Sequence, residues 1–279
     1  MAEQLWKGRQ SGPAAPILVR MGESIQLDIK LFRQDILGSR AHARMLGAIG
    51  ILSAAETEAI ESGLKQISGE IERGELPLVA ELEDIHTHVE NRLKEIIGDV
   101  AGKLHTARSR NDQIALDTHL YVRDQSVRTW QGLLQIMATL LNRAQEQSST
   151  ILPGYTHMQI GQPVRLSHHL LAYFWKFMRD FDRFARSVET ANRLPLGSGA
   201  LAGVNYPVDR KLVQEKLGFA DLYENSMDAV SNRDHILEFL FAAAVLSVNA
   251  SRLAEEIILW MSSEFQFLEL PDTLTTGSS

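Results

Sequence analysis

Three long segments without proline constrain the fold more than any other feature of this sequence. They cover roughly residues 109–149, 164–193 and 231–270, and within them only the first contains a glycine, Gly132. All three are rich in Leu, Ala, Glu, Arg and Gln, which favour helices. We therefore predict three long α-helices.

Apolar side chains in these segments follow helical spacing. Leu133, Ile136, Met137 and Leu140 fit the i, i+3, i+4, i+7 pattern of one helix face. The third segment carries a wider apolar surface, made by Ile236, Leu237, Leu240, Ala244, Leu246, Leu253, Ile257 and Ile258. Such a surface is typical of a helix at the centre of a bundle or an oligomer. The alternative is a long amphipathic helix at the edge of a monomer.

Residues 1–105 show shorter amphipathic segments, separated by loops such as Leu76-Pro77 and Gly98-Asp99. Strand signals are sparse, and no internal repeat is present. We predict an all-α protein with a small N-terminal helical domain, residues 1–105. An incomplete domain of long bundle helices, residues 106–279, follows it.

Charge and composition narrow the functional classes. The net charge of -7 disfavours nucleic-acid binding, although a local cluster of arginines can still bind a small anion. The absence of cysteine excludes disulfides and thiolate metal sites. The N-terminus lacks the pattern of a secretory signal. The most apolar stretch, around Phe239–Val248, is shorter than the ~20 residues of a membrane span. We expect a soluble cytoplasmic protein without a membrane segment.

Residues 102–113, GKLHTARSRNDQ, form the first motif. Its Ser, Asn and Asp side chains favour a helix start, where backbone N–H groups and the helix dipole attract anions. Two arginines beside such an end, Arg108 and Arg110, favour carboxylate binding. An ordinary capped helix start with solvated arginines explains the same residues.

Residues 153–163 form the second motif, PGYTHMQIGQP, which we interpret as a loop before the second long helix. His157 beside Thr156 is a candidate proton donor near neutral pH. A structural, hydrogen-bonded histidine is the alternative, and it is our interpretation of His168 and His169. No HExxH or Cys/His cluster is present, so no metal site is expected.

The chain ends in a third motif, residues 275–279, TTGSS, which alone indicates only a flexible end or a tag remnant. Together, the three motifs resemble the conserved regions of argininosuccinate lyases, a branch of the fumarase/aspartase superfamily. Further similar strings are LWKGR at residues 5–9, DILGSRAHA at 35–43, EDIH at 83–86, PLGSGALAG at 195–203 and DAVSNRD at 228–234. Ala107 replaces a glycine usual in the family, and Asn232 replaces an aspartate.

This resemblance implies a cofactor-free, reversible cleavage of argininosuccinate into arginine and fumarate. A base must remove a proton from the carbon beside a carboxylate, and an acid must protonate the leaving nitrogen. By resemblance, Ser278 is the catalytic base and His157 belongs to the proton-donating side. The implied substrate-binding residues are Ser24, Asp84, Arg110, Asn111 and Thr156.

The resemblance also implies a homotetramer whose active sites are shared between subunits. The family's loop continues beyond the position of Ser279, so we expect the 279-residue chain alone to be inactive. Two alternatives stay open: another fumarate-releasing lyase, such as adenylosuccinate lyase, and a non-catalytic structural protein like the lens crystallins of this fold.

Overall fold

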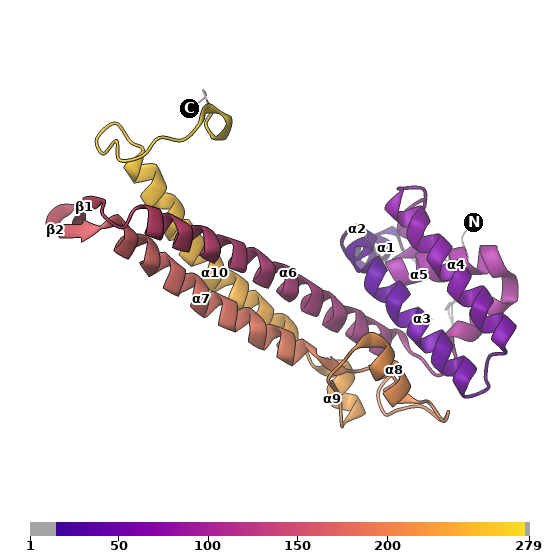
Figure 1. Ribbon diagram of the computed structural model, residues 1–279. Helices are drawn as coiled ribbons and strands as arrows, with labels where there is room; N and C mark the ends of the chain where they lie inside the picture. The colour runs from indigo at the N-terminus through magenta and orange to yellow at the C-terminus, as the bar shows by residue number, and fades with distance from the viewer. Residues whose placement is uncertain (1–14, 277–279) are drawn as a thin grey trace. The chain divides into compact units, whose positions relative to one another are not determined.

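A computed structural model of the chain describes residues 15–276 and is built mainly of α-helices (Figure 1). This architecture confirms the predicted all-α class. The chain divides into two compact units. The first combines the described residues up to Arg123 with Ala191–Arg233, and the second comprises Asp124–Thr190 and the described residues from Asp234 onward.

The first unit is a cluster of short and medium helices with two short strands. Its α-helices are α1 (Pro16–Gly22), α2 (Ile25–Asp28), α3 (Phe32–Ala48), α4 (Ala54–Glu72), α5 (Ile85–Ile97), α8 (Arg210–Leu217), α9 (Ser226–Ser231) and the first turns of α6 (Arg110–Glu146). Its 3₁₀ helices are η1 (Ile29–Leu31), η2 (Ala80–Leu82) and η3 (Gly98–His105). Strands β3 (Arg193–Leu194) and β4 (Asp221–Leu222) pair in parallel.

The core of the first unit lies between α3, α4 and α5. Ile60 and Leu64 of α4 are buried in one cluster with Ile85 of α5. A Cβ atom on Gly63 would lie only 2.6 Å from Leu93 Cδ1, so glycine permits the close approach of α4 and α5. The start of α4 is fixed by a capping box between Ser53 and Glu56.

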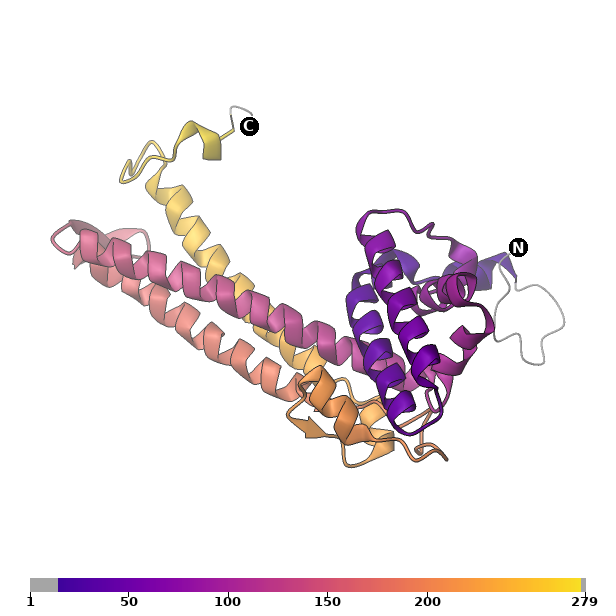
Figure 2. The same ribbon diagram turned by 45° about the vertical axis from the view of Figure 1, so that its right-hand side comes forward.

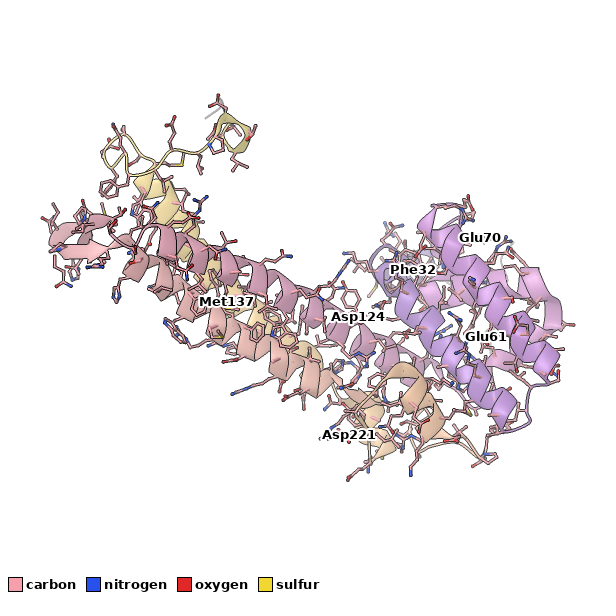
Figure 3. The ribbon with its side chains drawn as sticks, viewed as in Figure 1. Phe32, Glu61, Glu70, Asp124, Met137 and Asp221 are labelled. Atoms are coloured by element: carbon pink, nitrogen blue, oxygen red, sulfur yellow. The ribbon has the colours of Figure 1, made fainter. Side chains whose placement is uncertain are left out.

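The second unit packs the later part of α6 against α7 (Leu166–Ala191) and α10 (Asp234–Trp260). These helices lie side by side in Figure 1 and Figure 2. Their core contains Leu133, Met137, Leu140, Tyr173, Phe177, Phe184 and Ala242. Figure 3 labels one residue from each core, Phe32 in the first unit and Met137 in the second. The short η4 (Asp272–Leu274) follows α10.

The boundary between the units differs from the one placed at residue 105. The first turns of α6 pack with α3: a Cβ atom on Gly38 would lie 2.6 Å from Leu116 Cδ2. Residues 191–233, expected in the long-helix domain, also belong to the first unit. The helix α6 is continuous through Gly132.

Two local expectations were wrong. The segment expected as a loop before α7 is an antiparallel hairpin of β1 (Ile151–Thr156) and β2 (Gln159–Arg165). The third long helix ends at Trp260, ten residues before the expected end. There the chain turns back, and the Phe267 N–H donates a 2.8 Å hydrogen bond to the Trp260 carbonyl.

Helix α10 exposes most of its apolar surface in this single chain. Its buried residues are His235 and Ala242, whereas Leu237, Leu240, Phe241, Val248 and Ile258 are exposed. By length and composition alone, α10 could cross a membrane: its most apolar window has a mean hydropathy of 1.5, and 6% of it is buried. An exposed apolar surface of this kind marks an interaction site.

Candidate active site

The first motif lies at the beginning of α6, where Asp112 organises the surrounding backbone. Its Oδ1 accepts a 2.9 Å hydrogen bond from the Ser109 N–H. Its Oδ2 accepts bonds from the N–H groups of Gly197, at 3.1 Å, and Gly199, at 2.8 Å. Both glycines have positive φ, so glycine is required for these turns. Asp112 thereby anchors the 195–203 loop to the start of α6.

Asn111 lies beside this loop and donates a 2.9 Å hydrogen bond from Nδ2 to the carbonyl of Ala200. It is the second residue of α6, directly after Arg110. The helix start predicted from the first motif is therefore confirmed. Just upstream, Ala107 has φ +58 in place of the family's usual glycine. Positive φ is costly for alanine, which gives this substitution a physical consequence.

Asp84 caps the beginning of α5. Its Oδ1 accepts hydrogen bonds from the N–H and the hydroxyl of Thr87, each 2.7 Å long. The preceding residue, Glu83, has φ +63 and ψ −65, and the Asp84 N–H bonds to the Leu82 carbonyl at 2.7 Å. These features define a strained γ-turn immediately before a candidate substrate-binding residue.

Ser24 reaches the same end of α5 through Asp28. The Ser24 hydroxyl donates a 2.6 Å hydrogen bond to Asp28 Oδ2, and the Ile85 N–H donates to Asp28 Oδ1 at 3.3 Å. The backbone N–H of Ser24 bonds to the Glu83 carbonyl at 3.0 Å. Sequence reasoning missed Asp28, although its position four residues after Ser24 was a usable helical signal.

Arg110 lies between two carboxylates. Its Nε is 3.5 Å from Asp84 Oδ2, and its Nη1 is 3.2 Å from Glu90 Oε1. Glu90 also contacts His105, at 3.4 Å, and Arg108, at 3.8 Å. Burial acts to raise the pKa of Glu90, but the hydrogen bond from His105 and the two arginine charges outweigh it, and the pKa is lowered. Glu90 was missed because an acidic residue within a helix carries no distinguishing signal.

Behind Arg110 lies a buried cluster of Asp35 from α3, His86 from α5 and Asp117 from α6. His86 Nδ1 is 3.0 Å from Asp35 Oδ1 and 3.5 Å from Asp117 Oδ2. Burial acts to lower the pKa of His86, but the charge of Asp35 and its hydrogen bond outweigh it and raise this pKa to about 9. Burial and the charge of Asp35 raise the pKa of Asp117 well above its ordinary value.

These three side chains have the ligand types of a divalent-metal site, and their ligand atoms lie within 4.8 Å of one another. The Asp35–His86 contact nevertheless fits a protonated imidazole held by a carboxylate. Spacing along the sequence could not reveal this cluster, because its members come from three separate helices.

Thr156 and His157 belong to the hairpin of the second unit. Thr156 pairs with Gln159, so His157 and Met158 form a two-residue turn. Both have positive φ, +53 and +62, as a type I′ turn requires. Such turns favour Asn-Gly, and the present pair exposes an imidazole at a strained position.

A cavity of about 580 Å³ lies under this hairpin and is lined in part by Thr156, His169, Glu256 and Trp260. His169 Nε2 is hydrogen-bonded to Glu256, which agrees with the structural role expected of this histidine. His157 is absent from the lining of this cavity.

The first unit thus places Ser24 and Asp84 at the start of α5, with Arg110 against Asp84, while Asn111 follows Arg110 on α6 and bonds to Ala200. Thr156 and His157 form a second group on the hairpin. Ser278 lies outside the described residues. Asn232, the other departure from the family pattern, follows α9 and donates its backbone N–H to the Asp228 carbonyl at 2.8 Å.

Comparison with known proteins identifies the family of this chain. Residues 8–279 match the protein family described as Lyase. Because the match extends over nearly all of the sequence, the chain belongs to this family of lyases.

Among curated relatives, argininosuccinate lyase of Symbiobacterium thermophilum is 51% identical over 276 residues, covering 99% of this chain and 60% of the relative. Argininosuccinate lyase of Leptospira biflexa is 50% identical over 277 residues, covering 99% and 58%. The chain therefore spans about three fifths of the length of these relatives.

Solved structures are also similar. An EDDS lyase variant with bound fumarate has a TM-score of 0.82 and 33% identity, covering 98% of this chain and 54% of that one. The class II fumarase of Schistosoma mansoni has a TM-score of 0.74 and 16% identity, covering 90% and 60%, a likeness of fold alone.

Proposed function

We propose that the protein is an argininosuccinate lyase, which reversibly eliminates arginine from argininosuccinate to leave fumarate. The observation that carries this proposal is about 50% identity to curated argininosuccinate lyases over 98–99% of the chain. The EDDS lyase variant with bound fumarate, which is 33% identical, supports a fumarate-related substrate.

In this proposal the first unit supplies the binding groups. Arg110 and Asn111 bind a substrate carboxylate at the start of α6, where the helix dipole adds a favourable field. Ser24 and Asp84 complete this side of the site. In this proposal no cofactor takes part, and polar side chains of the protein carry out both binding and proton transfer.

The proton transfers are assigned to the other motifs. Ser278 removes the proton from the carbon beside a carboxylate, and His157, with Thr156 contacting substrate, supports protonation of the leaving nitrogen. The strained, exposed turn at His157 supports this assignment, because strain of this kind concentrates at functional sites.

We further propose a homotetramer with shared active sites. Helix α6 has 37 residues and is therefore about 55 Å long. The first motif lies at its beginning and the second follows its end, so motifs from different copies provide a simple way to complete one site. The exposed apolar side of α10 supports burial against further copies, in a cytoplasmic protein.

Fumarate release, followed by ultraviolet absorbance, tests the activity. The gene product read through to its natural stop codon is compared with the 279-residue form, on argininosuccinate, adenylosuccinate and EDDS. Preferred turnover of argininosuccinate supports the proposal. Preference for another substrate assigns a related lyase, and no turnover by either form assigns a non-catalytic relative.

Two variants test the residue roles in the active form. Replacement of Ser278 by alanine should lower kcat by at least about 100-fold, the lower end for loss of general acid–base catalysis. His157→Asn should lower it similarly, whereas His168→Asn, at an exposed histidine without a catalytic role in this proposal, serves as the control. A kcat within threefold of wild type in His157→Asn would refute its assignment.

Light scattering after size-exclusion chromatography, without detergent, tests the assembly. A particle of four chains supports the tetramer. A monomer, or recovery of the protein with membranes, would contradict it. Mixing an inactive Arg110 variant with an inactive His157 variant tests sharing, because mixed assemblies regain activity only if one site uses both subunits.

A further inference from the structure

The side chain of Gln113 connects Arg110 to the buried cluster behind it. Gln113 is 2% exposed and lies one helical turn after Arg110 on α6. Its Oε1 accepts a 2.8 Å hydrogen bond from Arg110 Nη1. Its Nε2 donates a 2.5 Å hydrogen bond to Asp35 Oδ1. A single amide therefore has one partner on each side.

The two partners fix the direction of this amide. A guanidinium can only donate hydrogen bonds, and an ionised carboxylate can only accept them. Burial acts to raise the pKa of Asp35, but the charge of His86 and its hydrogen bond outweigh it and lower this pKa to about 2. Asp35 is therefore ionised near neutral pH. The oxygen of Gln113 must face Arg110, and the nitrogen must face Asp35.

Asp35 is itself held in place by the rest of the cluster. His86 Nδ1 bonds to the same Asp35 oxygen, and Asp117 lies on the other side of the imidazole. Asp35, His86 and Asp117 are 1%, 2% and 0% exposed, respectively. A charged group packed in this way has little freedom to move, so the position of Gln113 is determined by three helices.

The hydrogen bond from Arg110 to Gln113 is shorter than the contacts of Arg110 with two carboxylates. The distances from Arg110 to Asp84 and Glu90 are 3.5 and 3.2 Å, longer than the 2.8 Å bond to Gln113. A neutral acceptor also orients a guanidinium without adding negative charge. An anionic substrate would be repelled by a third carboxylate at this point.

We propose that Gln113 is a positioning residue, whose amide holds the Arg110 guanidinium in the direction needed to bind a substrate carboxylate. This inference rests on the proposed lyase function and on the binding role assigned there to Arg110. Gln113 itself need not touch the substrate. Its contribution reaches the substrate through Arg110.

The test uses Gln113→Met, which keeps the length of the side chain but removes both hydrogen bonds, in the active gene product. KM for argininosuccinate should rise about 10- to 100-fold, the range for loss of a hydrogen bond to a charged group, with kcat changed less than threefold. Gln113→Glu should raise KM at least as much, because it places a carboxylate against Asp35. Gln131→Met, at an exposed glutamine of α6, serves as the control.

A double-mutant cycle separates positioning from general damage. In an Arg110→Lys background, Gln113→Met should change KM less than about twofold, because the oriented guanidinium is already absent. Fumarate affinity, measured by calorimetry, gives the same comparison without turnover. If Gln113→Met fails to fold, Gln113→His and Gln113→Glu are measured in the same cycle.

The outcomes distinguish this inference from the proposed function. An active wild-type protein with unchanged KM in folded Gln113 variants, or equal effects in both backgrounds, would overturn the positioning role. A wild-type protein that neither cleaves argininosuccinate nor binds fumarate would overturn the proposed function itself.

Discussion

Replacing Asp112 should destabilise the first unit more than any other single polar substitution at the start of α6. Its side chain is fully buried and accepts hydrogen bonds from the backbone N–H groups of Ser109, Gly197 and Gly199. Asp112→Ala leaves all three donors without this partner. Hydrogen bonds to charged groups contribute about 1.5–3 kcal/mol each.

The expected loss is smaller than the sum of three such bonds, because water can enter the space and the loop can relax. We expect Asp112→Ala to lower the free energy of unfolding by about 3–5 kcal/mol, the range for breaking a buried charged network. Asp112→Asn should cost about 1–3 kcal/mol. The asparagine keeps one acceptor oxygen and carries no charge. Burial raises the pKa of the Asp112 carboxyl despite the three N–H bonds, so a neutral side chain avoids part of the cost of burial.

Urea denaturation followed by circular dichroism measures both losses, with the m-value as a check that unfolding remains comparable. Asp124→Ala, further along the same helix, provides a matched comparison. A loss below about 1 kcal/mol for Asp112→Ala would refute the reasoning. It would mean that the three contacts contribute no more than exposed hydrogen bonds do.

Three further predictions concern other parts of the molecule. Burial acts to lower the pKa of His86, but the charge and hydrogen bond of Asp35 outweigh it and raise this pKa from 6.5 to about 9. Between these pH values the folded state therefore holds a proton that the unfolded chain releases. The protonated His86 contributes about 3 kcal/mol to the free energy of unfolding below pH 6.5, and this contribution is lost as pH rises through 9. In His86→Asn the corresponding slope of unfolding free energy against pH should vanish. A persistent slope would exclude this histidine as its source. Glu83→Gly should raise the free energy of unfolding by about 1 kcal/mol in thermal denaturation, because glycine adopts the γ-turn without strain; a decrease would show that the turn is unstrained. Phe241→Asp, on the exposed side of α10, should reduce the assembly seen by light scattering, and an unchanged particle mass would remove this residue from the interface.

The long helices were predictable because each is a purely local pattern. Proline positions and apolar spacing identified α6, α7 and α10 without any tertiary information. The end of α10 was placed too late, because neither glycine nor proline marks the turn that follows Trp260. The hairpin was missed because Pro153 and Pro163, which face each other in it, normally argue against strands.

The candidate site was predictable only where it is contiguous in sequence. Arg110 and Asn111 lie in one motif at a helix start, and the structure keeps them there. Asp28 and Gln113 follow Ser24 and Arg110 at helical spacing, but their contacts with Ile85 and Asp35 are tertiary and leave no sequence signal. Glu90 contacts Arg110 from another helix, and no spacing rule relates the two. The resemblance to a family supplied site roles that residue patterns alone left open.

The turn at His157 and Met158 also bears on how this protein can change under selection. A two-residue I′ turn tolerates neither insertion nor deletion without shifting the strand register, and both of its positions favour Asn or Gly. In a population selected for heat resistance while activity is required, replacements at a site without a chemical role should therefore arise early. Persistence of the histidine alone, with Met158 replaced, would separate the side chain retained for chemistry from the one retained by chance.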